Sequence, residues 1–104
     1  MINMNPKEIK LTQQMDDETK IILTFLSMSK NRVKTFNTFY KDDILSTKQI
    51  SEKTKINLNT TGKTLKQLNE KGLLILLNPT VRANRKYKLT KKGQKIIKYI
   101  IKNK

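Results

Sequence analysis

The residues of this sequence that could perform catalysis or bind a metal are few and scattered. The chain has 104 residues, no histidine and no cysteine, and its three glycines stand apart from one another. Metal sites, thiol nucleophiles and phosphate-binding loops need such residues in groups. The only paired aspartates, Asp16-Asp17 and Asp42-Asp43, each precede an apolar stretch, where a helix start or a solvated turn explains them. We therefore expect no catalytic site, no metal and no cofactor.

Polar side chains at helical spacing offer a different chemistry, hydrogen bonding to nucleic-acid bases. At about 100° per residue, Thr61, Leu65 and Leu68 share one narrow face of a helix. The opposite face is polar and mostly basic, with Asn59, Thr60, Lys63, Lys66, Gln67 and Glu70. Amide and hydroxyl groups can read base edges, whereas lysines suit phosphates. The pattern predicts an amphipathic helix whose outer face suits contact with nucleic acid.

The signals at the ends of this helix place it after a second helix. Asn57 is a suitable N-cap residue, and Gly72 stands where a left-handed residue would end the helix. A Ser-x-x-Gln capping box at Ser46 begins the preceding helix. Two capped helices joined by a tight turn predict a helix-turn-helix over residues 46–71, with 57–71 as its second helix.

A β-hairpin with a basic tip is predicted directly after these helices. The run 73–77 is apolar, Asn78-Pro79 favours a turn, and 85–89 alternates polar and apolar residues as a half-buried strand does. The hairpin would span residues 73–89. Its tip and the residues beside it carry cations and an amide, which are Arg82, Asn84, Arg85 and Lys86.

These motifs resemble the winged helix-turn-helix of prokaryotic and archaeal transcriptional regulators, broadly of the MarR and ArsR kind. The resemblance covers residues 45–101 and is most specific at the Leu68-x-x-x-Gly72-Leu73 helix end and the Leu89-Thr90-x-x-Gly93 junction. It implies a mainly α fold with a small β-hairpin, an α+β class, flanked by N- and C-terminal helices. The wing lacks an acidic-x-basic pair, and the chain has no Cys or His, so the resemblance extends to fold and DNA binding but to no subfamily or effector.

The resemblance also implies how the chain would meet DNA. The helix 57–71 would lie in the major groove, and the wing segment 78–85 would lie on the minor groove or the backbone. The residues expected to contact double-stranded DNA are Lys48, Asn57, Asn59, Thr60, Lys63, Lys66, Gln67, Arg82, Asn84, Arg85 and Lys86.

The charge distribution supports a polyanionic partner. The chain has 23 basic and 8 acidic residues, a formal net charge of +15. Residues 1–43 hold 7 basic and 6 acidic residues, a net of +1, so residues 44–104 hold 16 and 2, a net of +14. This concentration disfavours a winged helix used only for protein contacts. The amides and hydroxyl of the second helix favour a sequence-specific regulator, with a non-specific architectural DNA-binding protein as the alternative.

Elements on both sides of this region complete one domain over residues 16–104. Residues 1–15 are expected to form a loosely ordered arm, and a helix is expected over 16–30. The segment 31–43 would be a helical extension or an ordered connection; its aromatic residues suit the core better than a platform for stacking bases. A C-terminal helix is predicted over 90–103, with Thr90 as its N-cap.

The C-terminal helix has more apolar surface than one core face needs. Its isoleucines and Tyr99 span an arc of about 200°. We expect a homodimer formed with the helix 16–30, through Ile22, Phe25, Ile97, Ile100 and Ile101. The alternative is that 32–43 covers this surface within one subunit.

The N-terminal residues do not resemble a secretory signal, because 1–14 are interrupted by Asn, Pro and charged residues. No apolar run approaches the roughly 20 residues of a membrane span. A cytoplasmic, nucleoid-associated protein is therefore expected.

Overall fold

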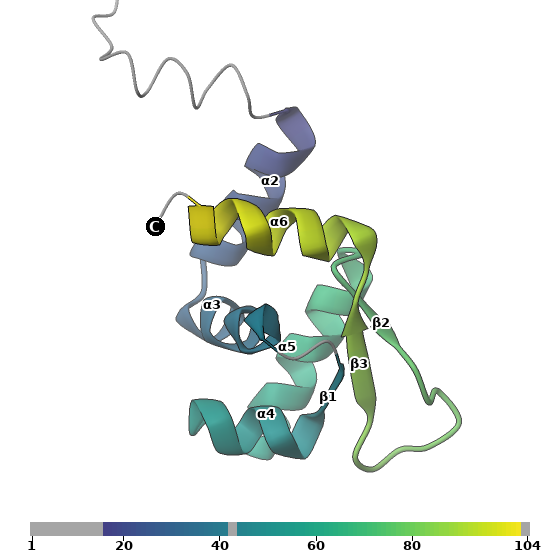
Figure 1. Cartoon of the computed structure of the whole chain (residues 1–104). Helices are drawn as coiled ribbons and strands as arrows, with labels where there is room; N and C mark the ends of the chain where they lie inside the picture. Colours follow the sequence, from purple (N-terminus) through teal and green to yellow (C-terminus); the bar gives the residue numbers. More distant parts are fainter. Residues whose placement is uncertain (1–15, 42–43, 103–104) are drawn as a thin grey trace, which may run out of the picture.

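The computed structural model describes residues 16–41 and 44–102. Its elements are α2 Asp17–Ser27, α3 Lys30–Asn37, the 3-10 helix η1 Thr38–Tyr40, β1 Ile44–Ser46, α4 Thr47–Thr54, α5 Leu58–Glu70, β2 Leu74–Leu76, β3 Lys86–Leu89 and α6 Lys91–Lys102. Helices α3, α4 and α5 lie beneath α6, and the wing projects on one side (Figure 1). Within the described residues, five α-helices and a three-stranded sheet confirm the predicted α+β winged-helix class. The predicted arm 1–15 lies outside the described residues.

The wing belongs to a sheet with one strand more than the sequence predicted. The strand order is β1-β3-β2, and both pairings are antiparallel. The hairpin of β2 and β3 lies within the predicted span 73–89. Its two strands are short, and a long loop, 77–85, joins them. Strand β1 has only three residues and pairs Leu45 with Tyr87 far along the chain. It lacks a local signal and was not predicted.

The N-terminal helix ends earlier than expected. Its N-cap is Asp16, whose carboxylate accepts a hydrogen bond from the Thr19 backbone N–H at 2.7 Å. The hydrogen bonds from the side chain and backbone of Thr19 lower the pKa of Asp16 to about 2. Helix α2 stops at Ser27 instead of continuing to residue 30, because the Ser29 hydroxyl accepts the Arg32 N–H and caps a new helix, α3. Most of the segment 31–41 is therefore helical, in α3 and η1.

The hydrophobic core draws on the α-helices, η1 and all three strands. Its buried apolar residues are Ile22, Leu26, Phe36, Phe39, Leu45, Ile50, Leu65, Leu68, Leu73, Leu74, Tyr87, Leu89, Ile96 and Ile97. Phe36 and Phe39 are fully enclosed, so these two aromatic residues pack in the core, as the sequence favoured, whereas Tyr40 is 55% exposed and does not.

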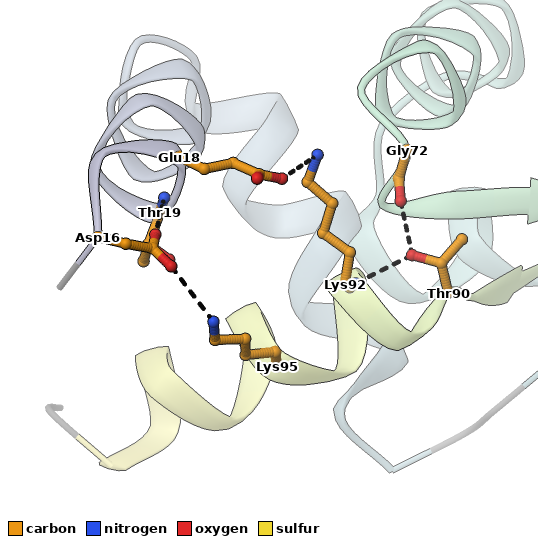
Figure 2. Close-up of polar contacts among 8 residues, drawn as sticks. Asp16, Glu18, Thr19, Gly72, Thr90, Lys92 and Lys95 are labelled. Atoms are coloured by element: carbon orange, nitrogen blue, oxygen red, sulfur yellow. Dashed lines mark hydrogen bonds and ion pairs between the residues drawn. The ribbon is translucent and has the colours of Figure 1, made fainter. Parts of the chain in front are cut away.

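Helix α6 starts in close contact with the end of α5. The Thr90 hydroxyl accepts the Gly93 N–H at 3.0 Å, as an N-cap does, and donates to the Gly72 carbonyl at 2.6 Å (Figure 2). A Cβ at Gly93 would lie only 2.2 Å from the Leu73 carbonyl oxygen, so this approach requires glycine. The predicted cap at Thr90 is confirmed and fixes α6 against the helix-turn-helix.

Two ion pairs connect α6 to α2. Lys92 Nζ lies 2.5 Å from Glu18 Oε1, and Lys95 Nζ lies 3.4 Å from Asp16 Oδ2 (Figure 2). Both pairs are solvent-exposed, so each adds little to stability. Ile22 and Leu26 of α2 and Ile96 and Ile97 of α6 are buried in the same core, and this shared burial holds the two helices together.

Candidate nucleic-acid interface

Helix α5 is capped at both ends as the sequence predicted. The Asn57 side-chain oxygen accepts the Thr60 N–H at 2.8 Å. At the other end Gly72 has φ of 77°, the Leu73 N–H donates to the Leu68 carbonyl at 3.0 Å, and the Gly72 N–H donates to the carbonyl of residue 69 at 2.9 Å. This pair of bonds is a Schellman motif, which ends the helix at a defined residue.

The inner face of α5 anchors it and leaves its polar face outward. Thr61, Leu65 and Leu68 are buried as predicted, and Thr64 joins them. The Thr64 hydroxyl donates to the Thr60 carbonyl at 2.9 Å, which satisfies its polar group inside the protein. Because four buried residues fix the rotation of the helix about its axis, its polar side chains face away from the core.

The turn before α5 sets its direction relative to α4. Lys55 has φ of 63° and reverses the chain at the end of α4. The Ser51 hydroxyl donates to the Ile56 carbonyl at 2.6 Å, and the Thr61 hydroxyl donates to the Asn57 carbonyl at 2.9 Å. At the start of α4 both halves of the capping box are formed, between Ser46 and residue 49. Local hydrogen bonds therefore fix both helices of the motif.

The loop of the wing holds its shape through its own side chains. The Asn78 side-chain oxygen accepts the Lys86 N–H at 2.8 Å across the hairpin. The Arg85 guanidinium donates from Nε to the Val81 carbonyl at 3.0 Å, and Asn84 takes up a φ of 53°. These contacts bend the loop between β2 and β3 into a defined shape.

The wing is also joined to the helix-turn-helix. The Arg85 carbonyl accepts from the Thr47 N–H at 2.9 Å and from the Thr47 hydroxyl at 3.1 Å. Thr47 is the first residue of α4, so these bonds hold the base of the wing loop beside the start of that helix. The wing and α5 are positioned through the same element.

A groove of about 560 Å³ lies between α5 and the wing. Its lining residues are Thr47, Lys48, Leu58, Asn59, Gly62, Lys63, Lys66, Arg82, Ala83, Asn84, Arg85 and Tyr87. Seven of the eleven residues predicted to bind DNA are among them, and the lining contains five cations and no carboxylate. The groove is therefore suited to a polyanion.

The other four predicted residues lie outside this lining. Asn57 is exposed, but its side-chain oxygen is used to cap α5, and Thr60 is half-buried. Lys86 is exposed on β3. The Gln67 side-chain oxygen accepts a hydrogen bond from Arg32 Nε at 3.2 Å, which occupies one of its two acceptor positions and restrains the side chain.

Arg32 is a residue that the sequence analysis missed. Its Nη1 donates to the Phe25 carbonyl at 2.9 Å, and its guanidinium carbon lies 4.1 Å from the centre of the Phe25 ring. Lys71 Nζ lies 4.9 Å from the same ring centre. Arg32 therefore connects the end of α2 to Gln67 on the outer face of α5. Nothing local signals this contact, because the two residues are 35 positions apart.

The residues predicted to form a dimer fall into two groups. Ile22 and Ile97 are 3% and 5% exposed and belong to the core of the single chain, so they are not on its surface. Phe25 and Ile100 are partly buried against that core, and Ile101 is 36% exposed. Two more apolar side chains on and beside α2, Ile21 and Met28, belong to the apolar stripe of the sequence that was expected to face inward, but both are exposed.

The described residues contain no group of three or more His, Cys, Asp or Glu side chains that could hold a metal ion. Among the helices in residues 16–41 and 44–102, none combines the length and apolar character needed to cross a membrane.

Solved structures of other proteins share this arrangement of helices and wing. MarR of E. coli in its reduced form superimposes with a TM-score of 0.60 at 19% identity, over 94% of this chain and 73% of that chain. Ligand-free NadR gives a TM-score of 0.63 at 18% identity, over 93% and 66%. The chain has the MarR-type winged-helix fold. HlyU of Vibrio cholerae also matches, with a TM-score of 0.63 at 15% identity, over 90% of this chain and 93% of that one.

This MarR-type chain is shorter than some of the structures it matches. It spans 66% of the NadR chain and 64% of the chain of BpsR from Bordetella bronchiseptica. No protein-family model and no curated protein matches the sequence. At these identities the likeness establishes the fold, and the resemblance to winged-helix regulators inferred from the sequence is confirmed at that level.

Proposed function

We propose that the chain is a sequence-specific regulator of transcription that binds double-stranded DNA, with α5 in the major groove and the wing loop on the minor groove or the backbone. The observation that carries this proposal is the groove between them, whose lining holds five cations and no carboxylate. A helix-turn-helix places its second helix in the major groove in the same way. BpsR, which shares the fold, is described by its regulated DNA binding.

Specific recognition is favoured over purely electrostatic binding by the chemistry of the α5 surface. Asn59 lines the groove next to Lys63 and is exposed. An amide can pair with both donor and acceptor positions of a base, whereas a binder of phosphates alone needs only cations. The second candidate, an architectural protein that coats any duplex, is supported by the net charge of +15.

The experiment that separates these functions is footprinting of the protein on its genomic DNA. A regulator should protect discrete sites that contain inverted repeats, whereas an architectural protein should protect DNA evenly. Anisotropy titrations of one protected site and one shuffled duplex, at the same salt concentration, then give the specificity ratio. A ratio near one would reject sequence-specific regulation and favour the architectural function.

We also propose that the regulator binds as a homodimer, with one α5 in each of two half-sites about 34–36 Å apart. Apolar side chains left exposed near the α2 and α6 helices support this: Ile21 is 62% exposed, Met28 75% and Ile101 36%. A second copy would cover them.

Ile101→Glu tests the dimer without disturbing the core, whereas a charge at buried Ile97 would unfold the chain. The variant should sediment as a monomer and bind the inverted repeat more weakly than the unmodified protein does. Lys98→Glu, an exposed change on the same helix, is the matched control and should remain dimeric. An unmodified protein that is monomeric at micromolar concentration would overturn the proposal.

A further inference from the structure

An exposed leucine lines the groove among charged and polar residues. Leu58 is the first residue of α5, and its side chain is 57% exposed. It lines the groove together with Lys48, Asn59 and Lys63. A single exposed leucine is ordinary on a protein surface. The residue one helical turn further along, Gly62, sets this leucine apart from others.

Gly62 lies in the interior of α5, where glycine is less favourable than alanine. Its φ is not positive, so the backbone does not require glycine. A Cβ built at Gly62 would meet nothing within 4 Å, so packing within the described residues does not require it either. At Gly93, in contrast, the added atom would collide with the Leu73 carbonyl. The described residues therefore leave open space above Gly62 that a partner can enter.

Leu58 and Gly62 lie on the same side of the helix, because residues four apart are neighbours on a helix surface. Both line the groove. Together they form a strip of apolar surface next to an open space, bordered by cations from α5 and the wing. The occupant should thus be a polyanion that presents a small apolar group at its edge.

We propose that the Leu58–Gly62 strip recognises the C5-methyl group of thymine in the major groove. The thymine methyl is an apolar group that distinguishes one base pair at the major-groove edge. Leu58 packs against the methyl, and the missing side chain at Gly62 lets the base edge approach the helix. This proposal rests on the proposed DNA-binding function and adds a specificity-determining contact to it.

The test replaces each thymine of the footprinted half-site, one at a time, with deoxyuridine, which removes only the methyl group. Affinities are measured by anisotropy at one salt concentration. For the unmodified protein, at least one replacement should weaken binding about fourfold, the factor for losing one buried methyl-sized group. With Leu58→Ala, the thymine and deoxyuridine duplexes should bind equally at that position.

Gly62→Ala gives an independent measurement. It should raise the melting temperature of the free protein, because alanine favours the helix. It should nevertheless weaken binding of the thymine duplex, and the deoxyuridine duplex should recover part of that loss because it frees the space of one methyl. A merely structural role for Gly62 would not link these two effects.

Leu77→Ala is the matched control, since Leu77 is 44% exposed and does not line the groove. It should retain the full response to deoxyuridine. Melting curves confirm that each variant is folded, and Leu58→Met, which keeps an apolar side chain, should retain the methyl response. Specific binding in which no deoxyuridine position depends on Leu58 would overturn this proposal alone. The absence of any specific duplex binding would overturn the proposed function with it.

Discussion

The α5 side of the groove and the wing use their polar side chains in different ways. Asn59, Lys63 and Lys66 on α5 have no side-chain hydrogen bond or ion pair to another described residue, although they line the groove. In the wing, Arg85 binds the Val81 carbonyl through its side chain, and the Asn78 side chain binds the backbone of the opposite strand. The polar side chains on α5 are therefore available to an outside partner, whereas those of the wing also hold the loop in shape.

The largest effects on discrimination are expected on the α5 side. Asn59→Ala and Lys63→Ala should each lower the preference for the footprinted duplex over a shuffled one by about 1–3 kcal/mol, because an amide pairs with adenine and a lysine, besides binding phosphates, also binds guanine O6 and N7. Their melting temperatures should stay near that of the unmodified protein, because both side chains are exposed. Anisotropy titrations of the two duplexes provide the measurement. Unchanged ratios for both variants would show that α5 does not read bases.

Gln67 is expected to be the exception on α5, because Arg32 already binds its oxygen. Gln67→Ala should therefore reduce discrimination less than Asn59→Ala does.

Arg32→Met should lower the free energy of unfolding by about 1–2 kcal/mol, since a charged donor to the Phe25 carbonyl is lost. Urea unfolding measures this loss. Arg32→Lys, which keeps the charge but not the planar guanidinium, should recover only part of it. If Arg32→Met is as stable as the unmodified protein, this connection is unimportant.

The features that the sequence predicted best depend on local chemistry. The caps at Ser46, Asn57 and Thr90 and the left-handed Gly72 all act within a few residues of their position, so their spacing in the sequence is enough to locate them. Ser29 has a similar signal, because its hydroxyl accepts the N–H three residues later, yet one uninterrupted helix was predicted over 16–30.

The features that were missed depend on distant parts of the chain. Strand β1 exists because Ile44 pairs with Lys88, and three residues carry too short an alternation to predict a strand. Ile97 is buried in the same core as Ile22 and Leu26 of α2, which lie about 70 positions earlier in the chain, so local periodicity does not show which part of the chain covers it. The groove could be predicted only in part. Residue types indicated which side chains suit DNA, but only the folded structure shows that Arg85 both lines the groove and binds the Val81 carbonyl within the loop.

The two arginines of the wing, Arg82 and Arg85, differ in how their side chains are bonded. Both line the groove, but only Arg85 has a hydrogen bond inside the loop. Arg82→Ala should lower the slope of log affinity against log salt by about one unit on both specific and shuffled duplexes. Arg85→Ala should lower the slope similarly and, in addition, reduce the free energy of unfolding by about 1 kcal/mol. An unchanged slope for both variants would mean that the wing does not contact the DNA backbone.

The smallest effect is expected at Asn78, which supports the wing without lining the groove. Its side-chain oxygen accepts the Lys86 N–H at 2.8 Å at an exposed position. Asn78→Ala should therefore cost only about 0.5–1 kcal/mol of stability, because water can replace the lost acceptor. Asn78→Asp is the matched control, since its carboxylate keeps the acceptor and should preserve the hydrogen bond.

The effect of Asn78→Ala on DNA binding distinguishes a supporting role from direct contact. A loosened loop must be ordered again on binding, so affinity for all duplexes should fall by the same small factor. The salt slope should stay constant, because no cation is removed. Hydrogen exchange should become faster at the Lys86 amide, which loses its acceptor. A drop in the salt slope, or a loss confined to the specific duplex, would instead show that Asn78 itself contacts DNA. Asn78 would then belong with the DNA-contacting side chains of α5 and not with the side chains that only support the loop.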